Sequence, residues 1–335
     1  MFGLELSTIW AGIIAFAVLT YVILDGFDLG VGILFPFSRD EQERDLMMNS
    51  VAPIWDGNET WLVLGGGGLF AVFPLAYAVI MPAVYIPVIG MLLALVFRGV
   101  SFEYRWRTSR WRRLWDHAFF GGSLAAGFCQ GLILGALVQG IDVQERAYVG
   151  GTWDWLTPFS MLVGLAVPTG YALLGAAWLH MKLAGVLQER MRKLARRFGV
   201  ATLAFMLAVS FSTPYESTTY LQRWFSWPMN LWTIVVPMLV VTLVWGAERG
   251  LTLRRDVSPF LCSLGLFVVA FIGLGISFWP YIIPPSVTIA EAAAPDKSLQ
   301  FTLAGTLVLI PIILTYTAYT YWVFRGKIDP EEGYH

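Results

Sequence analysis

The sequence predicts an all-α, polytopic membrane protein whose nine transmembrane helices form one domain over residues 1–335. Hydrophobic residues make up 57% of the chain and charged residues only 13%, whereas an ordinary soluble domain has about 25% charged residues. The mean hydropathy is +0.65. The apolar residues are gathered into runs near the length that a helix needs to cross a bilayer, about 20 residues.

Nine such runs follow one another along the chain, separated by short polar connections. Their approximate bounds are 8–28, 52–73, 76–98, 117–140, 157–180, 199–216, 229–248, 258–282 and 301–324. Only a tight turn at Pro74 separates the second run from the third, so this boundary is the least sharp. Pro168, Pro237 and Pro311 fall inside runs, which membrane helices tolerate where neighbouring groups satisfy the freed carbonyls.

The distribution of Lys and Arg predicts the orientation of these helices. With the N-terminus in the periplasm and the C-terminus in the cytoplasm, 19 of the 22 cationic residues fall on the cytoplasmic side. The three that fall outside are Arg146, Arg223 and Lys297. Cationic residues prefer cytoplasmic connections. With eight or ten spans, the cations would no longer be separated in this way between the two sides. We therefore expect nine spans in a bacterial inner membrane.

The composition also narrows the function classes. A net charge of −1 gives no basis for a nucleic-acid partner. The three histidines, His117, His180 and His335, lie at the ends of runs or of the chain. A haem in a helix bundle usually takes an axial histidine from the core, and Cys129 and Cys262 are isolated in apolar runs. We expect this chain itself to bind neither haem nor metal.

Two pairs of carboxylates are the candidates for chemistry, because ionisable groups at membrane depth cost free energy. Asp25 and Asp28 close the first run at the cytoplasmic boundary, on one helical face. Two like charges this close raise the proton affinity of one of them, which suits a proton relay. Solvated end residues that pair with loop arginines are the structural alternative.

Asp56 and Glu59 form the second pair, with the same spacing, at the start of the second run. Acidic residues in a first helical turn are favoured by the helix dipole, which is their structural alternative. The predicted orientation places both pairs on the cytoplasmic side, on helices joined by a short connection. We treat all four carboxylates as candidates for a proton path.

Two groups of glycines are candidates for close helix packing. One is a series in the second run, and the other recurs every four residues in the fourth run, a pattern that lets helices approach. They are Gly65, Gly66, Gly67 and Gly68, and Gly127, Gly131 and Gly135. Whether the partner helix belongs to this chain or to another is left open. Gln130 is polar at mid-membrane, and we expect it to make an interhelical hydrogen bond.

Several segments resemble subunit II of the cytochrome bd quinol oxidases. The most distinctive are residues 25–32, DGFDLGVG, and residues 48–62, MNSVAPIWDGNETWL. Shorter similar stretches lie at 70–74, 97–105, 278–280, 284–286 and 311–314. The compact length and the pair Asn58 and Glu59 are most similar to the cyanide-insensitive branch. Glu59 departs from relatives that have Gln there.

The resemblance implies a heterodimer with a homologous subunit I, which carries haem b, haem d and the quinol-oxidising loop, while subunit II is haem-free. Such a complex oxidises quinol and reduces dioxygen to water with protons from the cytoplasm. By the resemblance, Asp25, Asp28 and Asp56 correspond to acidic positions near the subunit interface, on a proposed cytoplasmic proton path. Membrane lipids, quinone and a small single-helix accessory subunit are further partners that it allows.

Two other functions remain open on the sequence. A secondary transporter would use the same carboxylates for ion coupling, but such proteins often show inverted repeats and helices interrupted near the midplane. Nine spans do not divide into equal halves, and the carboxylates lie at the ends of runs. The second alternative is a purely structural membrane partner that conducts no proton.

Overall fold

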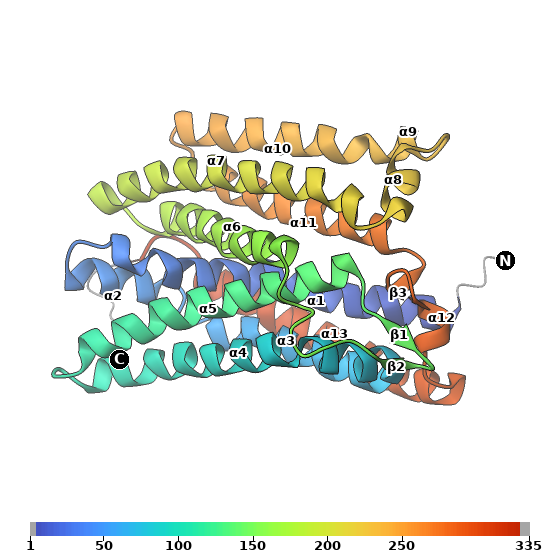
Figure 1. Ribbon diagram of the computed structural model, residues 1–335. Helices are drawn as coiled ribbons and strands as arrows, with labels where there is room; N and C mark the ends of the chain where they lie inside the picture. The colour runs from blue at the N-terminus through green and yellow to red at the C-terminus, as the bar shows by residue number, and fades with distance from the viewer. Residues whose placement is uncertain (1–4, 329–335) are drawn as a thin grey trace.

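The computed structural model describes residues 5–328 and folds them into a bundle of long helices that run side by side (Figure 1). The prediction of a helical membrane protein is confirmed, and each predicted run overlaps one of the long helices. These are α1 (Leu6–Leu34), α3 (Trp55–Val72), α4 (Pro74–Arg107), α5 (Arg112–Gln139), α6 (Pro158–Lys182), α7 (Gly185–Glu216), α10 (Val235–Thr252), α11 (Ser258–Phe278) and α13 (Asp296–Val323).

Eight helical segments of the described residues are long and apolar enough to cross a membrane. They include all the long helices except α3; α1 is extended by the 3-10 turn η1 (Phe35–Phe37), and α10 is preceded by α9 (Asn230–Thr233). Helix α3 is too polar because its first two turns carry Asp56, Asn58 and Glu59, but it packs along α1.

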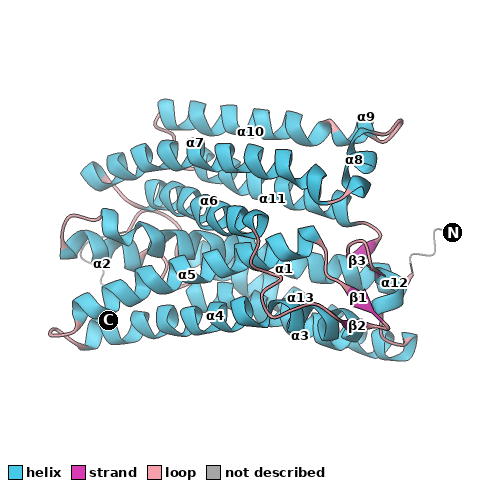
Figure 2. Ribbon diagram, viewed as in Figure 1, coloured by secondary structure: helices cyan, strands magenta, loops and turns pink. Residues whose placement is uncertain are grey.

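The connections contain short elements that the sequence analysis did not predict (Figure 2). They are the helices α2 (Glu41–Asn49), α8 (Thr218–Phe225) and α12 (Ile289–Ala292), the antiparallel pair β1 (Val143–Gln144) and β2 (Ala147–Tyr148), and the antiparallel pair β3 (Tyr281–Ile283) and β4 (Val287–Thr288). Elements this short leave no periodic hydrophobic signal. Both hairpins, α8 and α12 lie at the end of the bundle where α1 begins, and α2 lies at the opposite end (Figure 1).

Helix α1 occupies the middle of the bundle and packs against α3, α5 and α6. It continues for more than a turn past the predicted end of the first run, and it is buried without a break from Asp25 to Leu34. The reason is a very close approach of α6. A Cβ added to Gly30 would lie 1.9 Å from the carbonyl oxygen of Tyr171, and one added to Gly175 would lie 2.3 Å from the carbonyl carbon of Gly30. Only glycine leaves room for this contact between two backbones.

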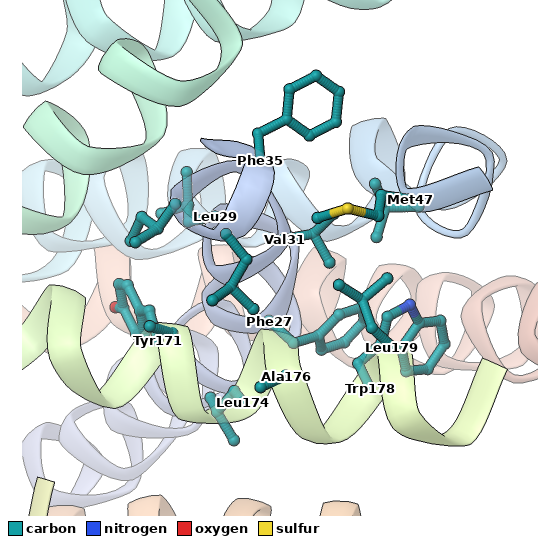
Figure 3. Close-up of a cluster of buried hydrophobic side chains, with 14 of the residues drawn as sticks. Phe27, Leu29, Val31, Phe35, Met47, Tyr171, Leu174, Ala176, Trp178 and Leu179 are labelled. Atoms are coloured by element: carbon teal, nitrogen blue, oxygen red, sulfur yellow. The ribbon is translucent and has the colours of Figure 1, made fainter. Parts of the chain in front are cut away.

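Side chains of α1 and α6 interleave beside this contact (Figure 3). The ring of Phe27 stacks on the indole of Trp178 with 4.4 Å between centroids, and Leu29 and Leu179 are fully buried in the same cluster. Met47 of α2 reaches the cluster from the end of the bundle. Because lipid is as apolar as these side chains, their close packing rather than exclusion of water holds the helices together.

The three glycines at four-residue spacing on α5 also pack within this chain, against α6. An added Cβ would lie 3.2 Å from the Tyr171 ring at Gly127, 2.4 Å from the Val163 carbonyl oxygen at Gly131, and 2.5 Å from the Ser160 Cα atom at Gly135. The question that the sequence left open is therefore settled for these three positions.

The glycine series on α3 divides between two faces of that helix. A Cβ at Gly65 would meet Val18 of α1, and one at Gly68 would meet Ile14 of α1. Gly66 and Gly67 are exposed, and an added Cβ would meet no other part of the described chain within 4 Å.

The contact between α1 and α6 generates a first prediction. The variant Gly30→Ala forces a methyl group into backbone atoms that cannot move aside, so we expect the protein to lose at least about 3 kcal/mol of stability, the upper end for an overpacked core. Thermal denaturation in detergent measures the loss. Gly12→Ala on the same helix is the control, because a Cβ there meets nothing within 4 Å; equal effects of the two variants would contradict the packing argument.

Candidate functional site

Arg98 of α4 lies at the centre of a buried polar cluster. Its Nη2 atom is 3.0 Å from Oδ1 of Asp25 and 3.8 Å from Oδ2 of Asp28, both on α1. Its Nη1 atom is 3.0 Å from Oε2 of Glu59 on α3. The side chains of Arg98, Asp25 and Asp28 are 0% exposed, and that of Glu59 is 27% exposed. We call these four residues the Arg98 cluster; it joins one cation to three carboxylates from two other helices.

Two neutral residues extend the Arg98 cluster to a fourth helix. Asn58 of α3 donates a hydrogen bond from Nδ2 to Oδ2 of Asp28 at 2.7 Å. The hydroxyl of Tyr321 on α13 donates to Oδ1 of Asn58 at 2.9 Å. Helices α1, α3, α4 and α13 are thereby tied together through polar side chains.

Two aromatic rings cover the guanidinium of Arg98. Trp55, the first residue of α3, stacks on Phe102 of α4 with 4.8 Å between ring centroids. The Cζ atom of Arg98 is 5.4 Å from the Trp55 centroid and 5.3 Å from the Phe102 centroid. Cation–π attraction strengthens where water is excluded, so the rings help to compensate the charge for its burial.

The hydrogen bonding of the Arg98 cluster is incomplete. The 3.0 Å contact between Arg98 and Asp25 is an ion pair without hydrogen-bond alignment. Within residues 5–328, neither oxygen of Asp25 has a hydrogen-bond partner, nor does Oδ1 of Asp28. A buried oxygen without a donor is unfavourable, and the unpaired oxygens are positions to which a proton can bind. Chemically, the arrangement suits the binding and release of protons.

The structure rearranges the predicted carboxylate pairs. Asp25 and Asp28 do not end a span beside loop arginines; they lie inside α1, and their cation comes from another long helix. Glu59 joins them, whereas Asp56 is exposed and makes no ion pair within the described part of the chain. The role of Arg98 is not visible in the sequence, because this residue stands at the very end of an apolar run, where a loop cation would also stand. The sequence signal that could have identified it is its place in the stretch 97–105, which resembles subunit II.

A second ionic cluster closes the end of the bundle at which α2 lies. The buried Arg105, two turns after Arg98 on α4, is 2.7 Å from Asp45 of α2 and 2.6 Å from Asp116 of α5. Arg44 is 3.0 Å from Asp116, and Arg112 is 2.8 Å from Asp45. These pairs fasten α2 to the helix ends, which gives Arg44, Arg105 and Arg112 a structural role.

The histidines and acids form no metal centre in the part of the chain that the structure describes. His117 is exposed at the start of α5. His180 is buried at the end of α6, where its Nε2 lies 3.3 Å from the carbonyl oxygen of Arg255. His335 lies outside the described residues.

Comparison with known proteins places this arrangement in a family. The family model described as cytochrome bd terminal oxidase subunit II matches residues 6–324. The chain belongs to the cytochrome bd terminal oxidase subunit II family. Cytochrome bd-I ubiquinol oxidase subunit 2 of Escherichia coli strain K12 is 32% identical over 98% of this chain and 96% of the relative. Cytochrome bd ubiquinol oxidase subunit 2 of Bacillus subtilis strain 168 is 29% identical over 98% of each chain.

A solved structure shows the same fold. A chain in the structure of bd oxidase from Geobacillus thermodenitrificans matches with a TM-score of 0.75 at 20% identity, over 96% of this chain and all of that one. The protein is therefore a multi-pass subunit II of the inner membrane and part of a quinol-oxidising oxidoreductase complex. The resemblance noted in the sequence is confirmed.

The Arg98 cluster generates a second prediction. Arg98→Met leaves two fully buried carboxylates without their cation, so the variant should lose about 3–5 kcal/mol of stability, as buried ion pairs do when one partner is removed. Thermal denaturation of the purified complex measures this loss.

Arg107→Met is the matched control on the same helix. Its pair with Glu103 spans 3.7 Å and is well exposed, so its removal should change stability by less than about 1 kcal/mol. If Arg98→Met were tolerated equally well, the Arg98 cluster would not hold the helices together.

Proposed function

We propose that this subunit contributes the Arg98 cluster to the oxidase as a proton-binding station on an uptake path from the cytoplasm. The observation that supports this most directly is the charge count. One guanidinium neutralises one carboxylate, and full ionisation would leave two excess negative charges deep in a membrane protein, where charge is costly. The cluster is stable with protons bound, and it can pass them on.

The burial of the four predicted carboxylates suggests the direction of the path. Asp56 is exposed at the start of α3, and Glu59, one turn later, is partly exposed. Asp25 and Asp28 are fully buried behind Arg98. In this proposal a proton passes from the surface at Asp56 and Glu59 to the two aspartates on α1. Haem b, haem d and the quinol site belong to subunit I, and this chain holds no redox centre.

The proposal includes nine spans, with the N-terminus in the periplasm and the C-terminus in the cytoplasm. Helix α3 is the ninth span: its 18 residues extend about 27 Å, and Asn58 and Glu59 of its polar turns face the Arg98 cluster. Arg146, Arg223 and Lys297 lie on elements at the end of the bundle where α1 begins. This distribution supports the orientation by the preference of cations for the cytoplasmic side.

The exposed side of α3 is the face that we assign to subunit I. It carries Asp56, Thr60, Gly66 and Gly67, which are polar or small, beside the exposed apolar side chains of Val63 and Phe70. Helices α7 and α10 instead expose large apolar side chains, such as Phe211 and Trp245, which suit membrane lipid and quinone. Membership of the cyanide-insensitive branch and a small accessory subunit stay predictions from the sequence.

The proton path generates a third prediction. Asp56→Asn should slow quinol-driven oxygen consumption several-fold, because general acid–base groups typically contribute that much or more, while the optical spectrum and assembly stay normal. Asp296→Asn, also in a first helical turn but at the start of α13, should leave the rate unchanged. A normal rate in Asp56→Asn would remove this residue from the path. Loss of assembly would instead favour a purely structural carboxylate.

The assignment of the subunit face generates a fourth prediction. Gly67→Leu adds a bulky side chain where a partner helix is to approach, so subunit I should copurify in smaller amounts. Gly121→Leu on α5 is the control, because this glycine is also exposed and its added Cβ meets nothing within 4 Å. Full copurification of Gly67→Leu with the haem-bearing partner would place the interface elsewhere.

A further inference from the structure

A second chain of polar side chains approaches the Arg98 cluster from the interior of the bundle. The Tyr171 hydroxyl on α6 donates to Oε1 of Gln130 on α5 at 2.7 Å. Nε2 of Gln130 donates to the hydroxyl oxygen of Tyr21 on α1, also at 2.7 Å. The interhelical hydrogen bond expected of Gln130 is thus doubled. Tyr21 is 4% exposed and Tyr171 is 1% exposed, so water competes little for these bonds.

The direction of these hydrogen bonds leaves the hydrogen of the Tyr21 hydroxyl available for donation to another group. Because the Tyr21 oxygen accepts from Gln130, the Tyr21 hydroxyl keeps its own hydrogen to donate. Asp25 lies one helical turn further along α1, on the same face, and both side chains are buried. Both oxygens of Asp25 are buried without a hydrogen-bond partner in the described chain. The Tyr21 hydroxyl, which is free to donate, is therefore a neighbour of the Asp25 carboxylate, which lacks a donor.

The far end of this hydrogen-bonded series of side chains, at Tyr171, is held rigidly. The ring of Tyr171 stacks on Phe267 of α11 with 5.8 Å between centroids. Glycines form the other walls of its slot: an added Cβ would lie 2.8 Å from the ring at Gly26 and 3.2 Å from it at Gly127. A fixed Tyr171 hydroxyl fixes the amide of Gln130, and the amide in turn fixes the rotation of the Tyr21 hydroxyl.

We propose that Tyr171, Gln130 and Tyr21 are positioning residues that direct one hydroxyl donor toward Asp25 and set how readily Asp25 releases its proton. A donor stabilises the ionised carboxylate over the protonated form. The other ionisable groups around Asp25 are Asp28 of α1, Glu59 of α3, Arg98 of α4, Tyr171 of α6 and Tyr321 of α13. The importance of this effect for turnover rests on the proton path proposed above.

The test follows the protonation of Asp25 itself in the assembled oxidase. Infrared difference spectroscopy detects the protonated carboxyl group, and the band that disappears in Asp25→Asn identifies this residue. In Tyr21→Phe the ionised form no longer has the Tyr21 hydroxyl directed toward it, so Asp25 should hold its proton more tightly. We expect its titration midpoint to rise by roughly one pH unit, a tenfold change in proton affinity. Gln130→Met should raise the midpoint in the same direction.

Combining the variants tests whether Gln130 acts through Tyr21. In the Tyr21→Phe background, Gln130→Met should add no further shift, because residues that act as one unit are not additive. Tyr220→Phe is the control: it also removes a buried hydroxyl, which donates to the Val138 carbonyl oxygen at 2.8 Å, but outside this chain of residues, and it should leave the midpoint unchanged.

Two results would overturn the inference. One is an unchanged Asp25 midpoint in Tyr21→Phe; the other is a full additional shift from Gln130→Met in the Tyr21→Phe background. Failure of the proton path looks different. In that case Asp25→Asn would keep the full oxidase rate, while the infrared midpoint would still move in Tyr21→Phe.

Discussion

Burial of the Arg98 guanidinium is the constraint on which the rest of the structure depends. A charge taken out of water is destabilising by several kcal/mol unless opposite charges and hydrogen bonds compensate it. Helices α1 and α3 must therefore present Asp25, Asp28 and Glu59 to one point on α4. Glycines permit this convergence. A Cβ at Gly122 of α5 would lie 2.6 Å from the Ala94 carbonyl oxygen and 3.0 Å from the Arg98 amide nitrogen, so α5 packs directly on the backbone of α4 beside the arginine.

The meeting of these helices at Arg98 also links the packing of the bundle to its proposed function. Helix packing in lipid relies on close van der Waals contact and interhelical polar bonds, and the Arg98 cluster together with Asn58 and Tyr321 supplies the polar part for four helices. Its excess of carboxylates over cations also makes it a store for protons. The residues that hold the bundle together and the residues proposed to move protons are then largely the same. This overlap explains why a subunit proposed to hold no redox centre carries so much buried charge.

The sequence predicted the helices well because a membrane span is identified by its own length and apolar composition. It predicted the family because residues 25–32 and 48–62 are distinctive. Contacts between segments that lie far apart in the sequence were harder to predict. Arg98 ends an apolar run exactly as a loop cation does, and only the fold shows that its side chain turns inward. The burial of Asp25 was missed because Gly26 and Gly30 were treated as part of a motif, and not as the surface on which α6 packs.

The central claim, that Arg98 balances buried negative charge, is tested most directly by removing the cation and the two buried carboxylates together. The measurement is the thermal stability of the oxidase with Arg98→Met, Asp25→Asn and Asp28→Asn combined, compared with Arg98→Met alone. If the loss in the single variant arises from uncompensated carboxylates, the combined variant should regain most of it. Losses that simply add from one substitution to the next would contradict the account.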